Sequence, residues 1–373
     1  MRVLFFNEGN LGTHILGQGQ LEEALHAGLA LAPEVQARFA GLTPIGRAGR
    51  AIATRPVPLL ASAGLDFPTL RWHGVQALRA RGDLRRELRA WPADAVHVHS
   101  HSVALAMVRT MHNTPVALSL DVTVGDWARM PAWYPSDPHP TLAMAPSLAL
   151  ERRALRSAAL VLAWTAWARR AVQRCAPGAR VVEHHPGIDL ERYRPAPRRE
   201  RARPRVLFVG GRFAEKGGED LLWALAEELG REVDLDLVTP VDVPARPGMT
   251  VHRLKPSDPK LLELQQQADL FCLPTHGDAA PWAVLEAMAC GTPVLSTRIG
   301  GIPDMLAEGR AGVLVPHDDR PALREALHAL LADPERRDLL GAAARAHCEQ
   351  RYDARHQFRS LIEHLEEAGR DHG

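Results

Sequence analysis

Short apolar runs alternate along the chain with longer stretches of helical periodicity. Each run has the length of a buried strand, and the segment from Gln18 to Leu31 is typical of the amphipathic helices between them. The predicted strands are Val3–Phe6, Ala95–His99, Pro115–Leu120, Leu160–Ala163, Val206–Val209, Leu270–Leu273 and Pro293–Thr297. Strands that alternate with helices in this way indicate an α/β fold with parallel sheets.

A run rich in proline and arginine, Arg192–Arg205, interrupts this pattern near the middle of the chain. It has no apolar periodicity, and we interpret it as a solvated linker. A chain of 373 residues is long for a single core, so we expect two domains, residues 1–200 and 201–373. The last part of the chain is predicted to be helical, over 321–331, 334–350 and 355–367.

A glycine-rich turn with two cations follows the predicted strand Val206–Val209. The turn, Gly210–Gly218, contains Arg212 and Lys216, and Lys216 is one of only three lysines in the chain. Glycines at a strand–helix junction let main-chain amides approach an anion, and the helix start adds a partial positive charge. A purely structural turn would explain the glycines but not the two cations, so we expect an anion site.

Two carboxylates stand at the mouth of a later strand–loop–helix unit. Asp278 lies in the loop after Leu270–Leu273, and Glu286 lies on the predicted helix Trp282–Cys290, with Pro281 at its first position. In open α/β sheets, ligands bind at the carboxyl ends of the strands. Carboxylates placed there can accept hydrogen bonds from the hydroxyls of a sugar or a ribose.

The segment Glu286–Val294, EAMACGTPV, and the turn Gly300–Pro303, GGIP, resemble the signature of the retaining glycosyltransferases of family 4. The resemblance implies a GT-B fold, in which two Rossmann-like domains face a central cleft and the C-terminal helix crosses back to the first domain. It implies a metal-independent hexosyltransferase or related glycosyltransferase that uses a nucleotide-diphosphate sugar and no further cofactor. The acceptor would be a glycan, a lipid-linked molecule or a small molecule.

The resemblance also assigns roles on the donor side. Arg212 and Lys216 match the family's cations that neutralise the diphosphate. Asp278 takes the place of a glutamate that contacts the transferred sugar. Glu286 takes the place of a glutamate that holds the ribose. The segment Val251–Lys255 lies where the backbone of the family meets the nucleobase. The expected donor-binding residues are Gly211, Arg212, Lys216, Arg253, Leu254, Asp278 and Glu286, of which Arg212, Lys216 and Asp278 are also expected to be catalytic.

Acceptor-side groups are expected at strand ends in the first half. They are Gly9 and Gly12 in the turn after the first strand, His99, and Asp121, which we also expect to be catalytic. The glycines are equally well explained by a tight structural turn. Asp121 stands where the family usually has a histidine, so it serves as the acceptor-side polar group or the chemistry is altered. The alternative for the whole chain is a non-catalytic nucleotide-sugar-binding protein with a degenerate acceptor site.

Other residue patterns set limits on partners. His97, His99 and His101 are spaced like metal ligands, but a zinc site needs a fourth or open position and a supporting shell, so we assign no metal. A pyridoxal phosphate enzyme of related architecture would need a lysine placed for the cofactor, and we find none. The 45 basic and 44 acidic residues give a net charge of +1, which does not favour nucleic acid as a partner.

The expected location is the cytoplasm. Four scattered cysteines fit a reducing compartment, and the first apolar run meets glycine too soon for a signal peptide. No segment approaches the roughly 20 apolar residues of a membrane helix. The arginine-rich helix predicted over Arg71–Arg89, with Leu78 on its apolar face, has two interpretations: it docks on the inner face of an anionic membrane or a lipid-linked acceptor, or it is a solvated surface helix.

Overall fold

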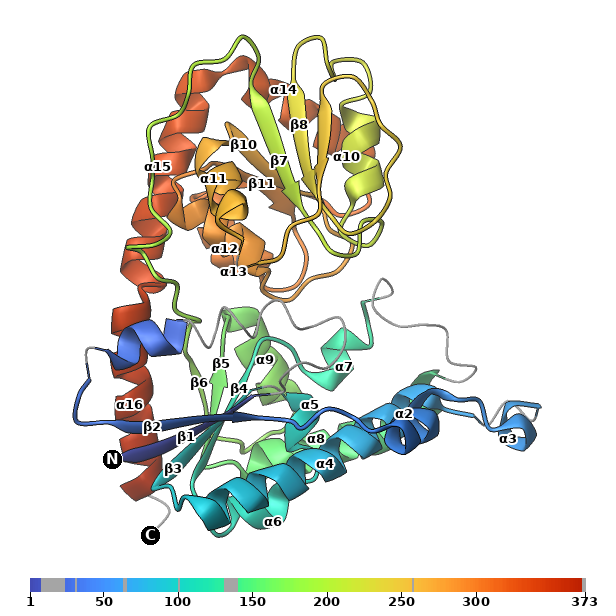
Figure 1. The fold of residues 1–373 in the computed structure, drawn as a ribbon, viewed down its shortest axis with the longest axis vertical. Coiled ribbons are helices and arrows are strands. Elements are labelled where there is room, and N and C mark those ends of the chain that lie inside the picture. The colour runs from blue at the N-terminus through green and yellow to red at the C-terminus, as the bar shows by residue number, and fades with distance from the viewer. Residues whose placement is uncertain are drawn as a thin grey trace. The chain divides into compact units, whose positions relative to one another are not determined.

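The computed structural model describes residues 1–7, 24–30, 32–62, 66–99, 101–130, 140–256 and 258–370 (Figure 1). The chain divides into two compact units. Unit 1 comprises Met1–His185 together with Arg355–Gly373, and unit 2 comprises Pro186–Ala354. The last helix therefore returns to unit 1, as the resemblance implied. The domain boundary expected at residue 200 lies inside unit 2.

Unit 1 contains a parallel sheet of six strands in the order β2-β1-β3-β4-β5-β6. The strands are β1 Arg2–Asn7, β2 Gln36–Gly41, β3 Ala95–His99, β4 Val116–Leu120, β5 Leu160–Ala163 and β6 Val181–Glu183. The helices are α2 Arg47–Thr54, α3 Pro58–Ser62, α4 Pro68–Ala90, α5 His101–Ala104, α6 Val108–Met111, α7 Val124–Trp127, α8 Pro140–Ser157, α9 Ala166–Cys175 and α16 Ala354–Arg370. Residues 24–29 are also helical.

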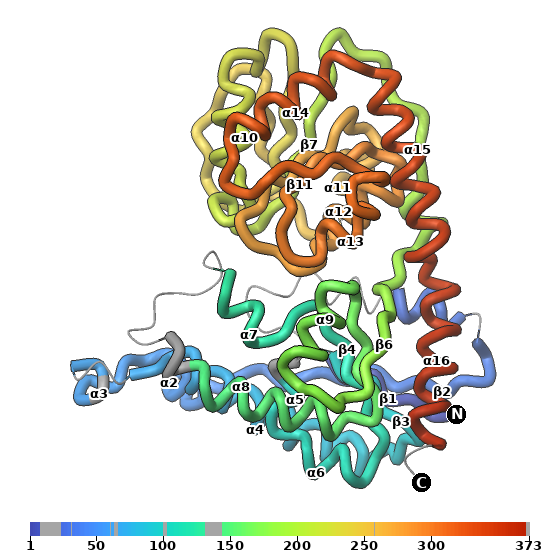
Figure 2. Tube along the Cα trace, turned by 180° about the vertical axis from the view of Figure 1, so that it is seen from behind, coloured from blue at the N-terminus to red at the C-terminus, as the bar shows by residue number. Residues whose placement is uncertain are grey.

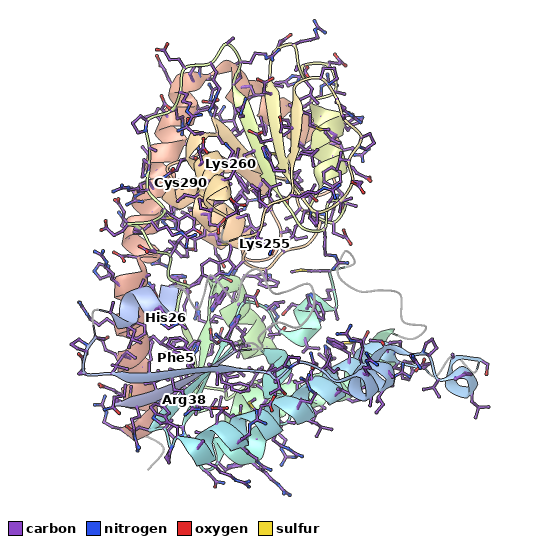
Figure 3. All side chains as sticks on the ribbon, in the orientation of Figure 1. Phe5, His26, Arg38, Lys255, Lys260 and Cys290 are labelled. Carbon is purple, nitrogen blue, oxygen red and sulfur yellow. The ribbon has the colours of Figure 1, made fainter. Side chains whose placement is uncertain are left out.

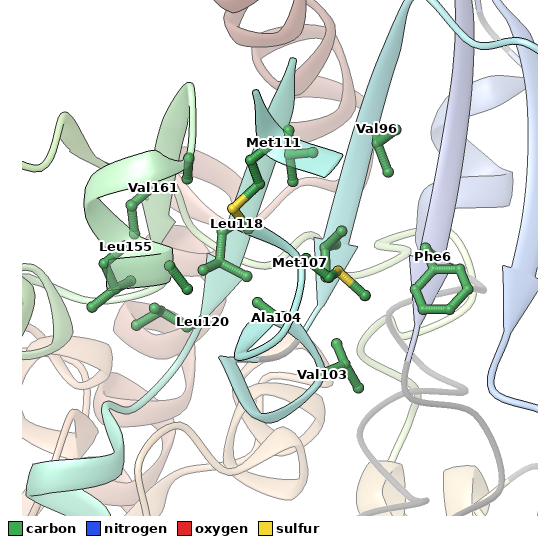
Figure 4. Packing of buried hydrophobic residues seen from close by; sticks show 14 of the residues in the cluster. Phe6, Val96, Val103, Ala104, Met107, Met111, Leu118, Leu120, Leu155 and Val161 are labelled. Carbon is green, nitrogen blue, oxygen red and sulfur yellow. The ribbon is translucent and has the colours of Figure 1, made fainter. Parts of the chain in front are cut away.

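One face of this sheet carries the main core of unit 1. Phe6, Val96 and Leu118 project from neighbouring strands into a buried cluster (Figure 4). Residues of α4, α5, α6, α8 and α9 complete the cluster, which explains why the predicted strands are continuously apolar. Leu78 is an exception to the sequence-based expectation, because it lies on α4 yet is exposed rather than packed.

The opposite face of the sheet is covered by α16. The ring of Phe5 lies 6.2 Å from that of Phe358 on α16 and stacks at 5.0 Å on Phe39, which in turn stacks on His26 at 4.0 Å (Figure 3). Gly28 allows the close approach of α16, because a Cβ at this position would lie 2.2 Å from the Cβ of Phe358. Apolar packing thus holds the C-terminal helix on unit 1.

Unit 2 contains a second parallel sheet, in the order β12-β11-β10-β7-β8-β9. Its strands are β7 Arg205–Val209, β8 Asp234–Val238, β9 Met249–His252, β10 Leu270–Leu273, β11 Val294–Thr297 and β12 Val313–Val315. Its helices are α10 Gly218–Ala224, α11 Pro259–Gln267, α12 Trp282–Ala289, α13 Ile302–Met305, α14 Arg320–Ala332 and α15 Pro334–Arg351. Within this unit α10 packs on α14 and α12 packs on α15 (Figure 2).

One local expectation needs correction. Pro281 precedes α12 as its N-cap residue instead of occupying the first position of the helix. Asp319 caps α14 by accepting a hydrogen bond from the Ala322 amide, whereas Asp318 has φ +60° and bonds to two histidines.

The largest correction concerns the arginine-rich run expected to be a solvated linker. Arg198 donates to the Gly291 carbonyl at 3.1 Å, Arg201 to the Gln267 carbonyl at 2.7 Å, and Arg203 to the Gly230 carbonyl at 2.5 Å. These three arginines therefore bind the segment to the rest of unit 2. Their guanidinium groups donate to main-chain carbonyls and are not only solvated by water.

Candidate functional site

The two sequence motifs of unit 2 meet at one point of its sheet. Strands β7 and β10 are neighbours, and the chain order reverses between them, since β8 follows on one side and β11 on the other. Such a switch point leaves a crevice at the carboxyl ends of the two strands, where open α/β sheets bind ligands. The glycine turn with Lys216 follows β7, and the loop with Asp278 follows β10. The topology therefore brings the cationic and the acidic motif together.

Lys216 and Asp278 form an ion pair across this switch point. Both side chains are largely shielded from solvent. Arg212 lies in the same turn and bonds Glu215 through Nε at 3.0 Å and Nη2 at 2.8 Å. Two predicted cations and one predicted carboxylate are thus held within two adjoining loops.

Two glycines let the loops pack this tightly. Gly217 has φ +78°, and a Cβ there would lie 1.9 Å from the Pro274 carbonyl oxygen. Gly300 has φ +56°, and its Cβ would lie 1.9 Å from the carbonyl oxygen of Asp278. No other residue type would fit either position, since both a left-handed backbone and the absence of a side chain are required. The GGIP turn thus supports the backbone at Asp278.

The main-chain amides of the glycine turn are used differently from the expectation. The amides of Lys216, Gly217 and Gly218 donate to the carbonyls of Arg212, Ala214 and Phe213, at 2.8 to 2.9 Å. These three amides close the turn on itself and are not directed at an anion. The full positive charges of this turn are those of the side chains of Arg212 and Lys216.

Glu286 is buried on α12, with 2% of its surface exposed. The Tyr193 hydroxyl donates to its Oε1 at 3.3 Å, and the Gln265 side-chain amide donates to its Oε2 at 3.4 Å. A buried carboxylate needs such donors to offset the loss of water. Burial, followed by the charge of Glu286, raises the pKa of Tyr193, so its hydroxyl stays protonated and acts as a donor at neutral pH.

Arg345 of α15 fixes the main chain around this carboxylate. Its Nη1 donates to the carbonyl of Tyr193 at 2.8 Å and to the carbonyl of Ala289, the last residue of α12, at 2.7 Å. The segment that carries Tyr193 and the helix that carries Glu286 are therefore joined at a single guanidinium.

A second polar network lies beside the glycine turn. His276 contacts Asp220 of α10 at 2.9 Å through Nε2 and Asp318 through Nδ1, and Arg320 donates to Asp220 at 2.6 Å. The amide of His276 donates to the carbonyl of Glu215, the residue before Lys216, at 3.0 Å. The network thereby connects the loop after β10 with α10 and the start of α14.

The remaining residues that we expected on the donor side lie along the same edge of the sheet. Gly211 is exposed at the start of the glycine turn. Arg253 and Leu254 follow β9, which is two strands away from β7, and Arg253 forms an ion pair with Asp242. The structure thus places these residues near strand ends, but Arg253 and Leu254 belong to another strand than the Lys216–Asp278 pair.

The expected acceptor-side residues of unit 1 also gather at strand ends. His99 ends β3, its Nδ1 donates to the Ser119 carbonyl at 3.2 Å, and its ring stacks on Trp164 at 4.7 Å. The Trp164 indole donates to the Ser119 hydroxyl at 2.8 Å. Asp121 directly follows β4 and is half-buried. Gly9 and Gly12 lie outside the described residues.

Four buried histidines of unit 1 are held neutral. Burial lowers the pKa of His73 and His99 to about 4 and that of His97 and His184 to about 3. His97 and His99 extend from the same strand, but the part of the chain that the structure describes contains no group of three histidine, cysteine, aspartate or glutamate residues arranged to hold a metal ion.

Two family models match the chain. The model described as Glycosyltransferase Family 4 matches residues 42–192, and the one described as Glycosyl transferases group 1 matches residues 203–333. The chain belongs to glycosyltransferase family 4. The two matches correspond to the main parts of units 1 and 2, so both halves of the chain support the assignment.

Curated relatives match about half of the chain. The D-inositol 3-phosphate glycosyltransferase of Streptomyces bingchenggensis is 33% identical over 44% of this chain and 43% of its own length. That of Corynebacterium urealyticum is 31% identical over 50% of each chain. The chain thus spans about half the length of the curated relatives it matches.

Solved structures resemble the chain over nearly its whole length. Sucrose-phosphate synthase from Thermosynechococcus elongatus has a TM-score of 0.72 and 18% identity, with 97% of each chain covered. HepE from Anabaena has a TM-score of 0.67 and 15% identity, covering 98% of this chain and 100% of its own. These likenesses establish the GT-B fold of two Rossmann-like sheets.

Sequence reasoning missed the two residues whose side chains bind Glu286. Tyr193 lies within the arginine-rich run that we expected to be solvated, and Gln265 lies on α11. A signal for Tyr193 was present, because an aromatic side chain in an otherwise polar run is usually there to be buried. Gln265 gave no comparable signal, since glutamine is common on helix surfaces.

Proposed function

We propose that this protein transfers a sugar from a nucleotide-diphosphate sugar to a glycan, lipid-linked or small-molecule acceptor. The transfer would retain the anomeric configuration and need neither a metal ion nor a further cofactor. The observation that carries the proposal is the pairing of Lys216 with Asp278 between the carboxyl ends of β7 and β10, with Arg212 in the same turn. The titles of the HepE structures name UDP and UDP-glucose as ligands, which supports a nucleotide sugar as the donor.

The chemical difficulty of this reaction lies in the leaving group. The bond between the anomeric carbon and the diphosphate oxygen breaks, and the nucleoside diphosphate leaves with the electron pair. The acceptor oxygen forms the new bond on the same face of the sugar, and its proton leaves with the diphosphate. Fixed cations lower the barrier because negative charge grows on the diphosphate as the bond breaks. We assign this role to Arg212 and Lys216.

The carboxylates bind the two sugars of the donor in this proposal. Asp278 accepts hydrogen bonds from the transferred sugar, and Glu286 accepts them from the ribose. Lys216 already neutralises Asp278, so donor binding would bring a diphosphate to a lysine that is held in position. Gly211, Arg253 and Leu254 would contact the nucleotide beside them. In unit 1, His99 and Asp121 would serve the acceptor side, together with Gly9 and Gly12.

The test begins with a thermal-shift screen against UDP-, GDP-, ADP- and TDP-sugars, since a ligand that binds the folded state raises the melting temperature. Release and transfer of sugar from the best donor are then measured for Lys216→Ala and Glu286→Ala. We expect turnover to fall roughly 100-fold or more for Lys216→Ala. Lys260→Ala is the matched control, because Lys260 pairs with Glu263 on the surface of α11 (Figure 3). Unchanged turnover in both site variants would refute the roles.

One observation supports the rival function, a non-catalytic nucleotide-sugar-binding protein. Asp121 places a carboxylate where the family usually has an imidazole beside the transferred sugar. Calorimetry with nucleoside diphosphates, combined with a search for released sugar, separates the two functions. Binding without release or transfer of sugar, over a panel of donors and acceptors, would favour the rival.

A further inference from the structure

The outer part of unit 1 exposes apolar side chains beside arginines. Among the described residues eight large apolar side chains are exposed, and four of them, Ile52, Val57, Leu59 and Leu78, lie on α2, α3, α4 and the link between α2 and α3. Leu59 is 82% exposed, Ile52 62% and Leu78 57%. Helix α2 packs on α4, and α3 follows α2 at the outer end of unit 1 (Figure 1, Figure 2). We call these four side chains the apolar tip.

Polar contacts hold the apolar tip in place. Arg71 of α4 forms an ion pair with Asp66 and donates to the Arg55 carbonyl at 2.8 Å. Asp66 also accepts a hydrogen bond from the amide of Val57 at 3.1 Å. The segment before α3 is therefore held through its main-chain groups. The side chains of Val57 and Leu59 remain exposed and available to a partner.

The apolar residues of α2 and α4 belong to the same surface. A Cβ at Gly49 of α2 would lie 3.9 Å from Cγ1 of Val75, so this side of α4 faces α2. Arg71, Val75 and Leu78 are four and three residues apart, a spacing that places them on one face of a helix. Leu78 thus lies on the side of α4 that α2 also occupies.

The charge around the apolar tip has a single sign. Residues 47–82 contain six arginines and one acidic residue, Asp66, for a net charge of +5. Asp66 is buried and paired with Arg71, so the described residues of this stretch, 47–62 and 66–82, present no exposed carboxylate. Arg47, Arg50 and Arg55 are exposed. A fitting partner is therefore anionic at its surface and apolar beneath it.

We infer that the apolar tip docks on an anionic membrane surface, with Leu59 and Ile52 entering the headgroup region and the exposed arginines contacting anionic headgroups. Binding of this kind adds apolar burial to attraction between the arginines and the lipid. The sequence alone suggested the arginines along Arg71–Arg89 as the membrane contact. We place the contact at the apolar tip instead, because Arg86 farther along α4 pairs with Asp83. Among the described residues, no helix is long and apolar enough to cross a membrane. The inference stands independently of the proposed transferase activity.

The test is co-sedimentation of the full-length protein with vesicles. Vesicles of phosphatidylcholine alone are compared with vesicles that also contain phosphatidylglycerol, at low and at high salt. We expect binding only to the anionic vesicles, weakened by salt because the charges are exposed. Leu59→Asp should lower the partition coefficient roughly tenfold, the effect of withdrawing one large apolar side chain from the interface. Leu339→Asp is the matched control, since Leu339 lies on α15 of unit 2 and is 73% exposed.

Three results would overturn the inference. The first is no binding to anionic vesicles at low salt. The second is equal binding by wild-type protein and Leu59→Asp, or an equal loss in Leu59→Asp and Leu339→Asp. The third is self-association in sedimentation velocity that Leu59→Asp abolishes while vesicles bind neither protein, because the apolar tip would then contact a second copy of the chain. Circular dichroism spectra that match wild type establish that each variant is folded.

Discussion

Replacing Tyr193 with phenylalanine tests whether the segment after unit 1 controls nucleotide binding in unit 2. The substitution removes the hydroxyl that donates to Glu286 at 3.3 Å and keeps the buried ring. A hydrogen bond to a charged group contributes about 1.5–3 kcal/mol at good geometry, and this bond is long. We therefore expect Tyr193→Phe to lose about 1 kcal/mol of nucleotide-binding free energy, which corresponds to an approximately fivefold higher Kd.

The affected contact should be the one with the ribose, since Glu286 is proposed to hold that sugar. The assay is calorimetry with the nucleoside diphosphate that binds best and with its 2′-deoxy form. In wild-type protein the ribonucleotide should bind more tightly. In Tyr193→Phe this preference should shrink about fivefold, because only the ribonucleotide uses the positioned carboxylate. The affinity for the deoxynucleotide should stay nearly constant.

Tyr352→Phe serves as the matched control, since Tyr352 is another buried tyrosine of unit 2. A loss of affinity that is equal for both nucleotides would mean that Tyr193 acts only on the stability of the unit, and would refute the positioning role. If neither protein distinguishes the two nucleotides, the assignment of Glu286 to the ribose is wrong. The two failures are therefore distinguishable.

Two predictions concern stability and pH. Burial raises the pKa of Glu151 to about 8, so the folded state keeps a proton that the unfolded chain loses above pH 4.5, and stability falls as the pH rises from 4.5 to 8. Glu151→Gln, which retains an acceptor for the Val124 amide, should therefore raise the free energy of unfolding at pH 8 by up to about 4 kcal/mol and leave it nearly unchanged at pH 4.5. Glu366→Gln, at an exposed position of α16, should change the free energy of unfolding at neither pH. In the Glu151→Gln background, the four buried histidines of unit 1 should each lower the free energy of unfolding by about 2 kcal/mol as the pH falls from 7 to 5. The reason is that these histidines take up protons in the unfolded chain but stay neutral in the folded state. A thermal-unfolding midpoint that stays constant over this pH range would contradict their burial as neutral groups.

The sequence was sufficient to predict the strands and motifs that follow local rules. The seven predicted strands are all present, because a short apolar run followed by a glycine or a polar turn has few alternatives in an α/β fold. The pairing of Lys216 with Asp278 also follows once β7 and β10 are neighbours, since both motifs directly follow their strands. The edge strand β2, QARFAG, was missed because it is polar and only partly buried.

The role of the glycines required the structure. A glycine-rich turn predicts either amides aimed at an anion or tight packing, and the sequence does not distinguish the two. The backbone settled the question at Gly217, whose amide closes the turn and whose missing side chain admits the Pro274 carbonyl. Long-range contacts of this kind depend on residues some sixty positions apart in the sequence, so local patterns do not contain them.

The arginine-rich segment after unit 1 shows why composition was a poor guide. Guanidinium groups carry five donors and can bind the carbonyls that helix ends leave without a partner. Arg201 binds the carbonyl of Gln267, the last residue of α11, and Arg198 binds that of Gly291, just beyond α12. A cation at the C-terminal end of a helix is also favoured by the helix dipole. These contacts give a segment without apolar periodicity a fixed path along unit 2.

That path determines how Glu286 is held. The segment contributes Tyr193 to the carboxylate on one side, and Arg198 to the end of the helix that carries the same carboxylate on the other. Arg345 joins the two by binding the carbonyls of Tyr193 and Ala289. A shift of the segment along α12 would first separate the Tyr193 hydroxyl from Glu286. At 3.3 Å this hydrogen bond is longer than those of Arg345, at 2.8 and 2.7 Å, and therefore weaker. Glu286, the carboxylate proposed to hold the ribose, is therefore coupled directly to the chain that leads out of unit 1.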